Sequence, residues 1–272
     1  MSEHGSVVDL QLDRAHSSRI YDYFLGGKTN FLADRMAAGE VLSAFPAALV
    51  AARINREFMH RTTRVLAASG MRQFLDIGTG IPTPPNLHEV AQGIAADARV
   101  VYTDNDPIVL AHAAALLLST PEGRTAYVQA DVTDPAGILK APQLLDALDL
   151  NRPVALSLNA LMHFVPDDGR DHAHTIVETL KAALPSGSTL AMSHATADFD
   201  PGVMGKIIKI YGAAGTRLQF RSRAAFLRFF DGWELLEPGV ILSHQWRPDR
   251  PGDATHVTDT EAACYAGVAR KP

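Results

Sequence analysis

The sequence predicts an α/β protein in which a doubly wound, mainly parallel sheet follows a helical N-terminal segment. After Gly70, short β-rich runs alternate with helical stretches, an order typical of parallel strands joined by right-handed crossovers. Residues 14–68 instead carry apolar side chains at three- and four-residue steps and show no strand pattern. We therefore expect residues 1–70 to form a helical cap or lid and residues 71–272 to form the sheet domain.

Five short runs supply the expected parallel strands, and a later pair of runs closes the sheet. The five runs are residues 73–77, 100–103, 126–130, 154–158 and 189–193. Helical patterns follow at 202–213 and 222–230, and the runs 233–236 and 263–269 predict a closing antiparallel pair.

Helix starts between these strands support the same order. Asp106-Pro107 and Asp134-Pro135 each place a side-chain acceptor at the N-cap and a proline at the first helical position. Asn86 precedes Glu89 by the three residues of a capping box. Each signal predicts a helix beginning directly after a strand or its loop.

Composition bounds the class of protein. A chain of 272 residues with 47% hydrophobic residues is long enough for one large α/β domain. The single cysteine excludes a disulfide framework, and the N-terminal residues lack the apolar stretch of a secretory signal, so we expect a cytoplasmic protein. The longest apolar run, 109–118, is too short to span a bilayer, and a net charge of −5 argues against a broad nucleic-acid interface. We expect neither a membrane nor a nucleic acid as partner.

The segment FLDIGTGIPTPPN, at the end of the first strand, contains a glycine loop. Gly78 and Gly80 supply the G-x-G of a nucleotide-binding turn, in which small residues let the backbone approach a ligand. A dinucleotide site also needs a third small residue and helix N–H groups for the pyrophosphate. Here that position is threonine, and prolines at 82, 84 and 85 have no N–H to donate. The loop therefore favours an uncharged nucleoside over a phosphate.

Acidic residues follow the first three strands. Asp104 and Asp106 both end the second strand; because Asp106 has the sequence of a helix cap, we assign Asp104 to the two ribose hydroxyls. Asp131 is expected at the adenine amino group, with a turn residue as the alternative, and Asp76 at a ligand ammonium or the loop itself. These features point to an adenine nucleoside that carries positive charge and no phosphate, and S-adenosylmethionine meets these conditions. The cofactor contacts expected from these loops are Asp76, Gly78, Thr79, Gly80, Asp104, Asn105, Asp131 and Val132.

Together with that loop, the blocks SRIYDYFLGGKTNF, LMHFVPD, SHATAD and FFDGWELLEPG resemble a family of class I S-adenosylmethionine-dependent methyltransferases. Its N-terminal signature is R-x-Y-D-Y-x-L-G-G-K-x-N-F, and the resemblance runs from about Arg19 to the C-terminus. It implies a Rossmann-like, seven-stranded methyltransferase sheet whose last strand is antiparallel. It also implies that Asn159, Ala160 and His163, after the fourth strand, border the methionine end of the cofactor. The chain departs from the commonest class I loop by its three prolines and missing third glycine.

The N-terminal signature also contains a Gly-Lys-Thr that resembles the end of a phosphate-binding loop. The glycine that such a loop needs five residues earlier is replaced by Asp22, so we expect no triphosphate site. We expect instead a lid over the cofactor, in which Tyr21 covers the ligand, Gly27 lets the backbone approach it, and Arg19, Lys28 or Asn30 engages its carboxylate. An ordinary helical core with a glycine turn is the alternative.

Methyl transfer is an in-line displacement, so a general base is needed only when the acceptor atom carries a proton. His163, His194 and Asp198 follow predicted strands at the sheet edge where α/β proteins keep their sites, and we expect them to be the catalytic groups. His163 is the first choice, and a structural histidine is the alternative. Cys264, within the predicted last strand, is expected away from the site.

Two clusters of side chains could bind a ligand or could simply be solvated residues of a helix. His172 and His174 do not share a helix face, so we expect no metal site there. Four arginines between residues 217 and 228 fit either an acidic substrate or a solvated helix face.

The function that the residues and the resemblance predict is methyl transfer from S-adenosylmethionine to a small-molecule acceptor. A protein that binds S-adenosylmethionine without catalysis is the second hypothesis. A nicotinamide-dependent oxidoreductase is the third, and the proline-rich loop argues against it. The sequence names neither the acceptor nor an oligomeric state.

Overall fold

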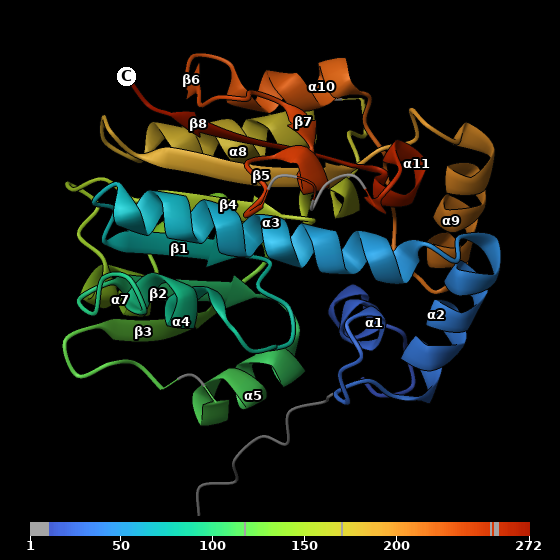
Figure 1. The fold of residues 1–272 in the computed structure, drawn as a ribbon. Coiled ribbons are helices and arrows are strands. Elements are labelled where there is room, and N and C mark those ends of the chain that lie inside the picture. The colour runs from blue at the N-terminus through green and yellow to red at the C-terminus, as the bar shows by residue number, and fades with distance from the viewer. Residues whose placement is uncertain (1–10, 117, 170, 251, 253–255) are drawn as a thin grey trace, which may run out of the picture.

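The computed structural model describes residues 11–272 except 117, 170, 251 and 253–255. At its centre lies one sheet with the strand order β3-β2-β1-β4-β5-β8-β6, and β7 also pairs with β8 (Figure 1). The strands are β1 (Gln73–Ile77), β2 (Arg99–Asp104), β3 (Arg124–Gln129), β4 (Ala155–Asn159), β5 (Thr189–Ala195), β6 (Glu234–Leu235), β7 (Ile241–Leu242) and β8 (Cys264–Arg270).

The pairing of the strands confirms the expected topology. Strands β1 to β5 pair with one another in parallel, and β8 runs antiparallel to β5. The short strands β6 and β7 pair with opposite ends of β8, at Ala269–Arg270 and at Tyr265–Ala266 respectively. They therefore form one edge strand broken in two, so that the eight strands of the described residues occupy seven positions.

Helices fill the crossovers and precede the first strand. They are α1 (Ser17–Phe24), α2 (Leu32–Ala44), α3 (Ala48–Ala68), α4 (Leu87–Gln92), α5 (Pro107–Leu116), α6 (Pro135–Leu139), α7 (Pro142–Ala147), α8 (His172–Ala182), α9 (Pro201–Ala213), α10 (Arg223–Leu227) and α11 (Asp259–Ala262), with short 3₁₀ turns η1 (Met162–Phe164), η2 (Arg228–Phe230) and η3 (Ser243–Gln245).

The expected helix caps are confirmed. The Asp134 carboxylate accepts a hydrogen bond from the Gly137 N–H at the start of α6, and Asn86 forms a capping box with Glu89 at the start of α4. These caps depend only on residues close in sequence, which is why the sequence predicted them.

Two apolar clusters hold the sheet between helical layers. On one face, strand residues such as Leu75 and Leu156 pack with Ile176 and Leu180 of α8. On the other face, Phe58 and other α3 residues pack with strand residues beneath α3. Figure 1 shows α3 running across the sheet. Successive side chains of a strand point to opposite faces of the sheet, so the apolar strands contribute side chains to both clusters.

A third cluster joins α1, α2 and the first half of α3 to α9, beyond the carboxyl ends of the parallel strands (Figure 1). Ile20, Val41 and Ala52 pack there with Met204 and Ile207. Helix α3 thus takes part in both the N-terminal cluster and the sheet core. No single helix of the described chain is long and apolar enough to cross a membrane; only α2 and α3 taken together, bent by 103°, have that length and composition.

Candidate active site

A cavity lies where the carboxyl ends of the parallel strands face the N-terminal helices. The space between its walls, together with the opening to solvent, is about 1570 Å³. The sheet edge and the loops after β1, β2, β3 and β4 form one wall, and side chains of α1, α2, α3 and α9 form the other.

The glycine loop after β1 lines this cavity. Gly78 and Gly80 have φ of +74° and +69°, the left-handed region that favours glycine. The N–H groups of Gly78 and Thr79 donate to the Thr103 carbonyl at 2.7 and 3.2 Å, and that of Gly80 donates to Asp104 Oδ2 at 2.8 Å. All three N–H groups are thus used within the protein, and none of them is directed at a pyrophosphate.

The two acids after β2 have different surroundings. Asp104 lines the cavity and is buried; besides Gly80, it accepts a hydrogen bond from the Asp106 N–H at 2.9 Å, and burial raises its pKa. Asp106 lies outside the cavity, where its Oδ1 accepts the Ile108 N–H of α5 at 2.9 Å. Its Oδ2 accepts from Arg19 Nε at 3.0 Å. Asp104 therefore faces the cavity, and Asp106 caps α5, as the sequence predicted.

Asp76 and Arg56 form the charged end of the cavity. Burial raises the pKa of Asp76 to about 6, although the nearby Ser157 hydroxyl and the Arg56 charge oppose that rise. Arg56 of α3 donates to the carbonyls of Thr83 and Pro85, and its Nε is buried without a partner in the described chain. Nothing in the spacing of α3 distinguishes Arg56 from Arg53, which is exposed, so the sequence did not predict this residue.

The turn after β4 presents strained backbone and an unpaired oxygen to the cavity. Ala160 has φ +50°, a conformation that costs about 1–2 kcal/mol outside glycine. Its N–H donates to the Ser193 carbonyl at 3.1 Å and to Ser193 Oγ at 2.9 Å, which holds the turn. Asn159 Oδ1 is buried and has no hydrogen-bond donor within the described residues. A buried acceptor beside a cavity is a position at which a ligand donor fits.

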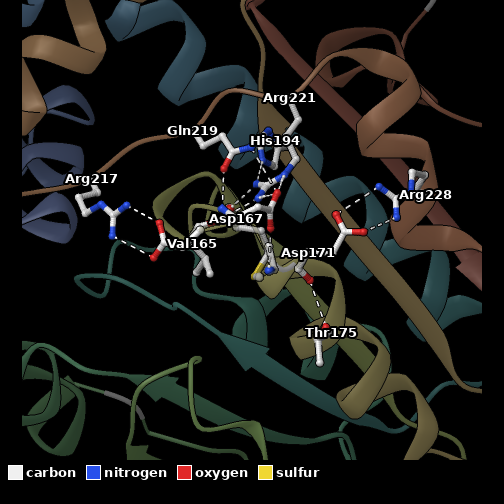
Figure 2. A network of polar contacts seen from close by, with 12 residues as sticks. Val165, Asp167, Asp171, Thr175, His194, Arg217, Gln219, Arg221 and Arg228 are labelled. Carbon is white, nitrogen blue, oxygen red and sulfur yellow. Dashed lines mark hydrogen bonds and ion pairs between the residues drawn. The ribbon is translucent and has the colours of Figure 1, made fainter.

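Of the three expected catalytic groups, only His163 lines the cavity. His194 is fully buried elsewhere: its Nε2 accepts from Arg221 Nη1 at 3.0 Å and its Nδ1 donates to the Ala195 carbonyl at 2.6 Å (Figure 2). Because an arginine only donates, these bonds specify the neutral tautomer of His194. Asp198 accepts from the Arg223 N–H and the Tyr265 hydroxyl. We expected His194 and Asp198 to be catalytic, but neither side chain lines the cavity and both are bonded within the protein. The structure therefore gives them structural roles.

Arg221 is the centre of the polar network in Figure 2. Its guanidinium donates to the carbonyls of Met162 and Val165, both at 2.9 Å, and to Asp167 Oδ2 at 2.6 Å. The two carbonyls flank His163, so Arg221 fastens the turn that carries this histidine. We expected the arginine cluster either to bind an acidic substrate or to form a solvated helix face. Arg221 does neither, because it is buried.

Within the N-terminal segment, Tyr21 lines the cavity and its hydroxyl donates to the Ala52 carbonyl at 2.9 Å. The other expected contacts lie elsewhere. Arg19 is buried against Asp106, and the Asn30 amide donates to Asp22 Oδ2 at 2.8 Å.

Gly27 also faces Asp22 rather than the cavity. A Cβ at Gly27 would lie 2.0 Å from Asp22 Oδ1, so its glycine accommodates a carboxylate of the protein and not a ligand. The assignment of Arg19, Gly27 and Asn30 to the cofactor is therefore not supported.

After β3, Val132 lines the cavity, but the Asp131 carboxylate does not. Asp131 is exposed and accepts from the Thr133 N–H at 2.8 Å and from the Asn105 amide at 2.9 Å. These bonds are those of a turn residue, the alternative that the sequence left open. Asn105, which bridges Asp131 to the cavity wall, is the cavity-lining member of this pair.

Cys264 was expected away from the site but lines the cavity. Because β8 is antiparallel, its first residue pairs with Ala195, the last residue of β5, and so begins at the edge where the parallel strands end. Burial raises the pKa of the Cys264 thiol to about 11, which keeps it protonated and weakly nucleophilic. Within the described part of the chain, no group of three or more His, Cys, Asp or Glu side chains could hold a metal ion.

Comparison with known proteins identifies the family of this chain. Residues 3–272 match a family model described as S-adenosyl methyltransferase. The structure of a DUF574 family protein from Streptomyces avermitilis is 51% identical, with a TM-score of 0.93 over 97% of this chain and 100% of that chain. A putative methyltransferase from Thermobifida fusca is 38% identical, with a TM-score of 0.88 over 96% and 97%. No curated protein sequence matches. The chain belongs to the S-adenosyl methyltransferase family, and it is an S-adenosylmethionine-dependent methyltransferase.

Proposed function

We propose that this chain methylates a small-molecule acceptor inside the cavity. The observation that carries the proposal is the lining of the cavity: the polar sheet edge forms one wall, and apolar side chains of the N-terminal helices and α9 form the other. A cofactor with polar groups fits the first wall, and an organic acceptor fits the second.

The polar sheet edge fits S-adenosylmethionine. Asp104 has lone pairs left for the ribose hydroxyls, and Asp76 and Arg56 offer a carboxylate and a guanidinium to the ammonium and carboxylate of the methionine part. The buried, unpaired Asn159 Oδ1 is a further acceptor for the ammonium. The cofactor supplies an electrophilic methyl group, and these residues orient it and exclude water.

The N-terminal helices supply the cover of this site. Tyr21 and Phe24 of α1 line the cavity opposite the glycine loop. We assign α1 and α2 to the role of the cap, while the second half of α3 belongs to the sheet core.

Two measurements test the proposal. Calorimetry should show binding of S-adenosylmethionine and S-adenosylhomocysteine and none of NAD, because the Gly78–Gly80 N–H groups are already bonded. Transfer of a labelled methyl group to compounds of a metabolite extract should separate catalysis from binding alone. Asp104→Ala should abolish the transfer, and Asp198→Ala, outside the cavity, is the matched control. Labelling of protein or nucleic acid with no labelled small molecule would contradict the proposal, and cofactor binding with no transfer would favour the non-catalytic alternative.

A further inference from the structure

The cavity continues from its polar sheet edge into an apolar compartment between the N-terminal helices and α9. The side chains that form this compartment are Val41, Phe45, Met204, Ile207, Leu218 and Phe220. Several of them also belong to the third apolar cluster, so the compartment is a gap in a hydrophobic core rather than a surface groove. Such a wall favours a ligand with apolar surface to bury.

Charged side chains of the cavity all lie at the other end. Asp76, Asp104 and Arg56 stand at the polar edge, and no other Asp, Glu, Lys or Arg of the described residues lines the cavity. A charged acceptor in the apolar compartment would lose its hydration without gaining an ion pair, which is costly. The acceptor that fits is uncharged.

Two polar groups interrupt the apolar wall, and both lie beside the ring of Phe164. The ring centroids of His163 and Tyr211 are 4.4 Å and 6.0 Å from that of Phe164. His163 is 8% exposed, and its buried Nδ1 has no hydrogen-bond partner within the described chain. Tyr211 is 9% exposed and lines the cavity, and its hydroxyl makes no hydrogen bond to the residues the structure describes. Buried polar groups without partners at a cavity point to a ligand that satisfies them.

The protonation of both groups follows from burial. Burial and the Arg221 charge lower the pKa of His163 to about 3, so its ring is neutral and offers one acceptor nitrogen near neutral pH. Burial raises the pKa of Tyr211, so its hydroxyl keeps its proton and can donate it. One acceptor and one donor together match a hydroxyl group, which both donates and accepts.

We propose that the methyl acceptor is an uncharged, largely apolar molecule whose hydroxyl donates to His163 and accepts from Tyr211. This inference rests on the proposed function. In the transfer, the acceptor oxygen bonds the methyl carbon and the electron pair of the broken carbon–sulfur bond stays on sulfur. The hydroxyl proton passes to the His163 ring and from there to water.

Three probes that share the naphthalene ring and differ in polarity test the inference: 2-naphthol, naphthalene and 2-naphthoate. Calorimetry would measure their binding to the protein saturated with S-adenosylhomocysteine. We expect 2-naphthol to bind at least about tenfold more tightly than 2-naphthoate, because the naphthoate carboxylate would be buried without a cation. We also expect it to bind more tightly than naphthalene, because naphthalene leaves both polar groups unpaired.

Variants assign the preference to individual residues. His163→Phe and Tyr211→Phe should each reduce the preference for 2-naphthol over naphthalene. Ile207→Lys should weaken 2-naphthol and strengthen 2-naphthoate, because it places a cation in the apolar wall. Its matched control is Ile208→Lys on the exposed side of the same helix.

Each outcome decides one proposal. Equal or tighter binding of 2-naphthoate, or no binding of 2-naphthol, with S-adenosylhomocysteine bound normally, would overturn the inference alone. Failure of S-adenosylhomocysteine to bind would overturn the proposed function itself.

Discussion

Two turns of this protein combine glycines with an aspartate, and only one of them faces the cavity. In the turn at 78–80, the Asp104 carboxylate holds the Gly80 N–H while the loop lines the site. In the turn at 26–30, the Asp22 carboxylate accepts from Asn30 and packs against Gly27, and no residue of the turn lines the cavity. Asp22 stands where a phosphate-binding loop would have glycine, and its carboxylate lies against Gly27 within the turn.

The difference shows that a glycine in such a turn indicates a position where a side chain does not fit. It does not indicate whether the backbone conformation or a neighbouring side chain is the reason. At Gly80 the cause is a left-handed φ beside open space, and at Gly27 it is a side chain 2.0 Å from where a Cβ would lie. Only the position of each turn relative to the sheet edge separates ligand binding from packing.

The largest effect on stability is expected at the ion pair between Arg19 and Asp106. This ion pair joins α1, the helix that precedes the second turn, to the loop after β2. Asp106→Ala removes the carboxylate that lies 3.0 Å from the buried Arg19 guanidinium and leaves only Asp34, at 3.9 Å, to pair with it, so we expect a loss of about 3–5 kcal/mol in the free energy of unfolding, measured with denaturant. Asp146→Ala, which breaks an exposed ion pair with Arg124, is the control and should cost less than about 1 kcal/mol. A loss at Asp106 no larger than the control would show that the helix is not held there.

Asp104→Ala should weaken S-adenosylhomocysteine binding by about 2–4 kcal/mol, or roughly 30- to 700-fold, because two charge-assisted hydrogen bonds to ribose are lost. Asp22→Ala is the matched change in the other turn, and its binding constant should equal that of the unmodified protein, since Asp22 does not line the cavity. Calorimetry on both variants measures this. Similar losses in the two would erase the distinction between the turns.

Gly27→Val should lower the free energy of unfolding by about 1–3 kcal/mol, the usual cost of overpacking, because its side chain overlaps Asp22. Cofactor affinity of the folded protein should stay unchanged. Gly39→Val in α2, where a Cβ meets nothing within 4 Å, is a control for the steric overlap. A weaker affinity with unchanged stability would return this turn to the role of a ligand-facing lid.

The smallest effect concerns the pH dependence of cofactor binding. Burial raises the pKa of Asp76 to about 6, so the carboxyl is protonated below that pH in the free protein. Binding of the methionine ammonium requires the carboxylate. Affinity should therefore be fully present above pH 6 and fall as the pH drops, by about tenfold at pH 5, because one pKa unit is worth about 1.4 kcal/mol. Asp76→Asn should show weaker, pH-independent binding, and an unchanged pH profile in this variant would assign the effect to another group.

The sequence by itself determined the features that depend on neighbours along the chain. Strand β1, the caps at Asp134 and Asn86 and the left-handed glycines of the loop follow from local propensity, capping and backbone geometry. The separation of Asp104 from Asp106 followed in the same way, since the proline after Asp106 predicts a helix start.

Only the tertiary structure decided which side chains face the cavity. Arg19 finds Asp106, 87 residues away, and His194 finds Arg221, 27 residues away, so neither is left for a ligand. Arg56 and Cys264 reach the cavity because of the packing of α3 and the antiparallel direction of β8. The physical reason is that burial, ion pairing and pKa depend on elements that meet in space, and spacing along the chain does not specify those meetings.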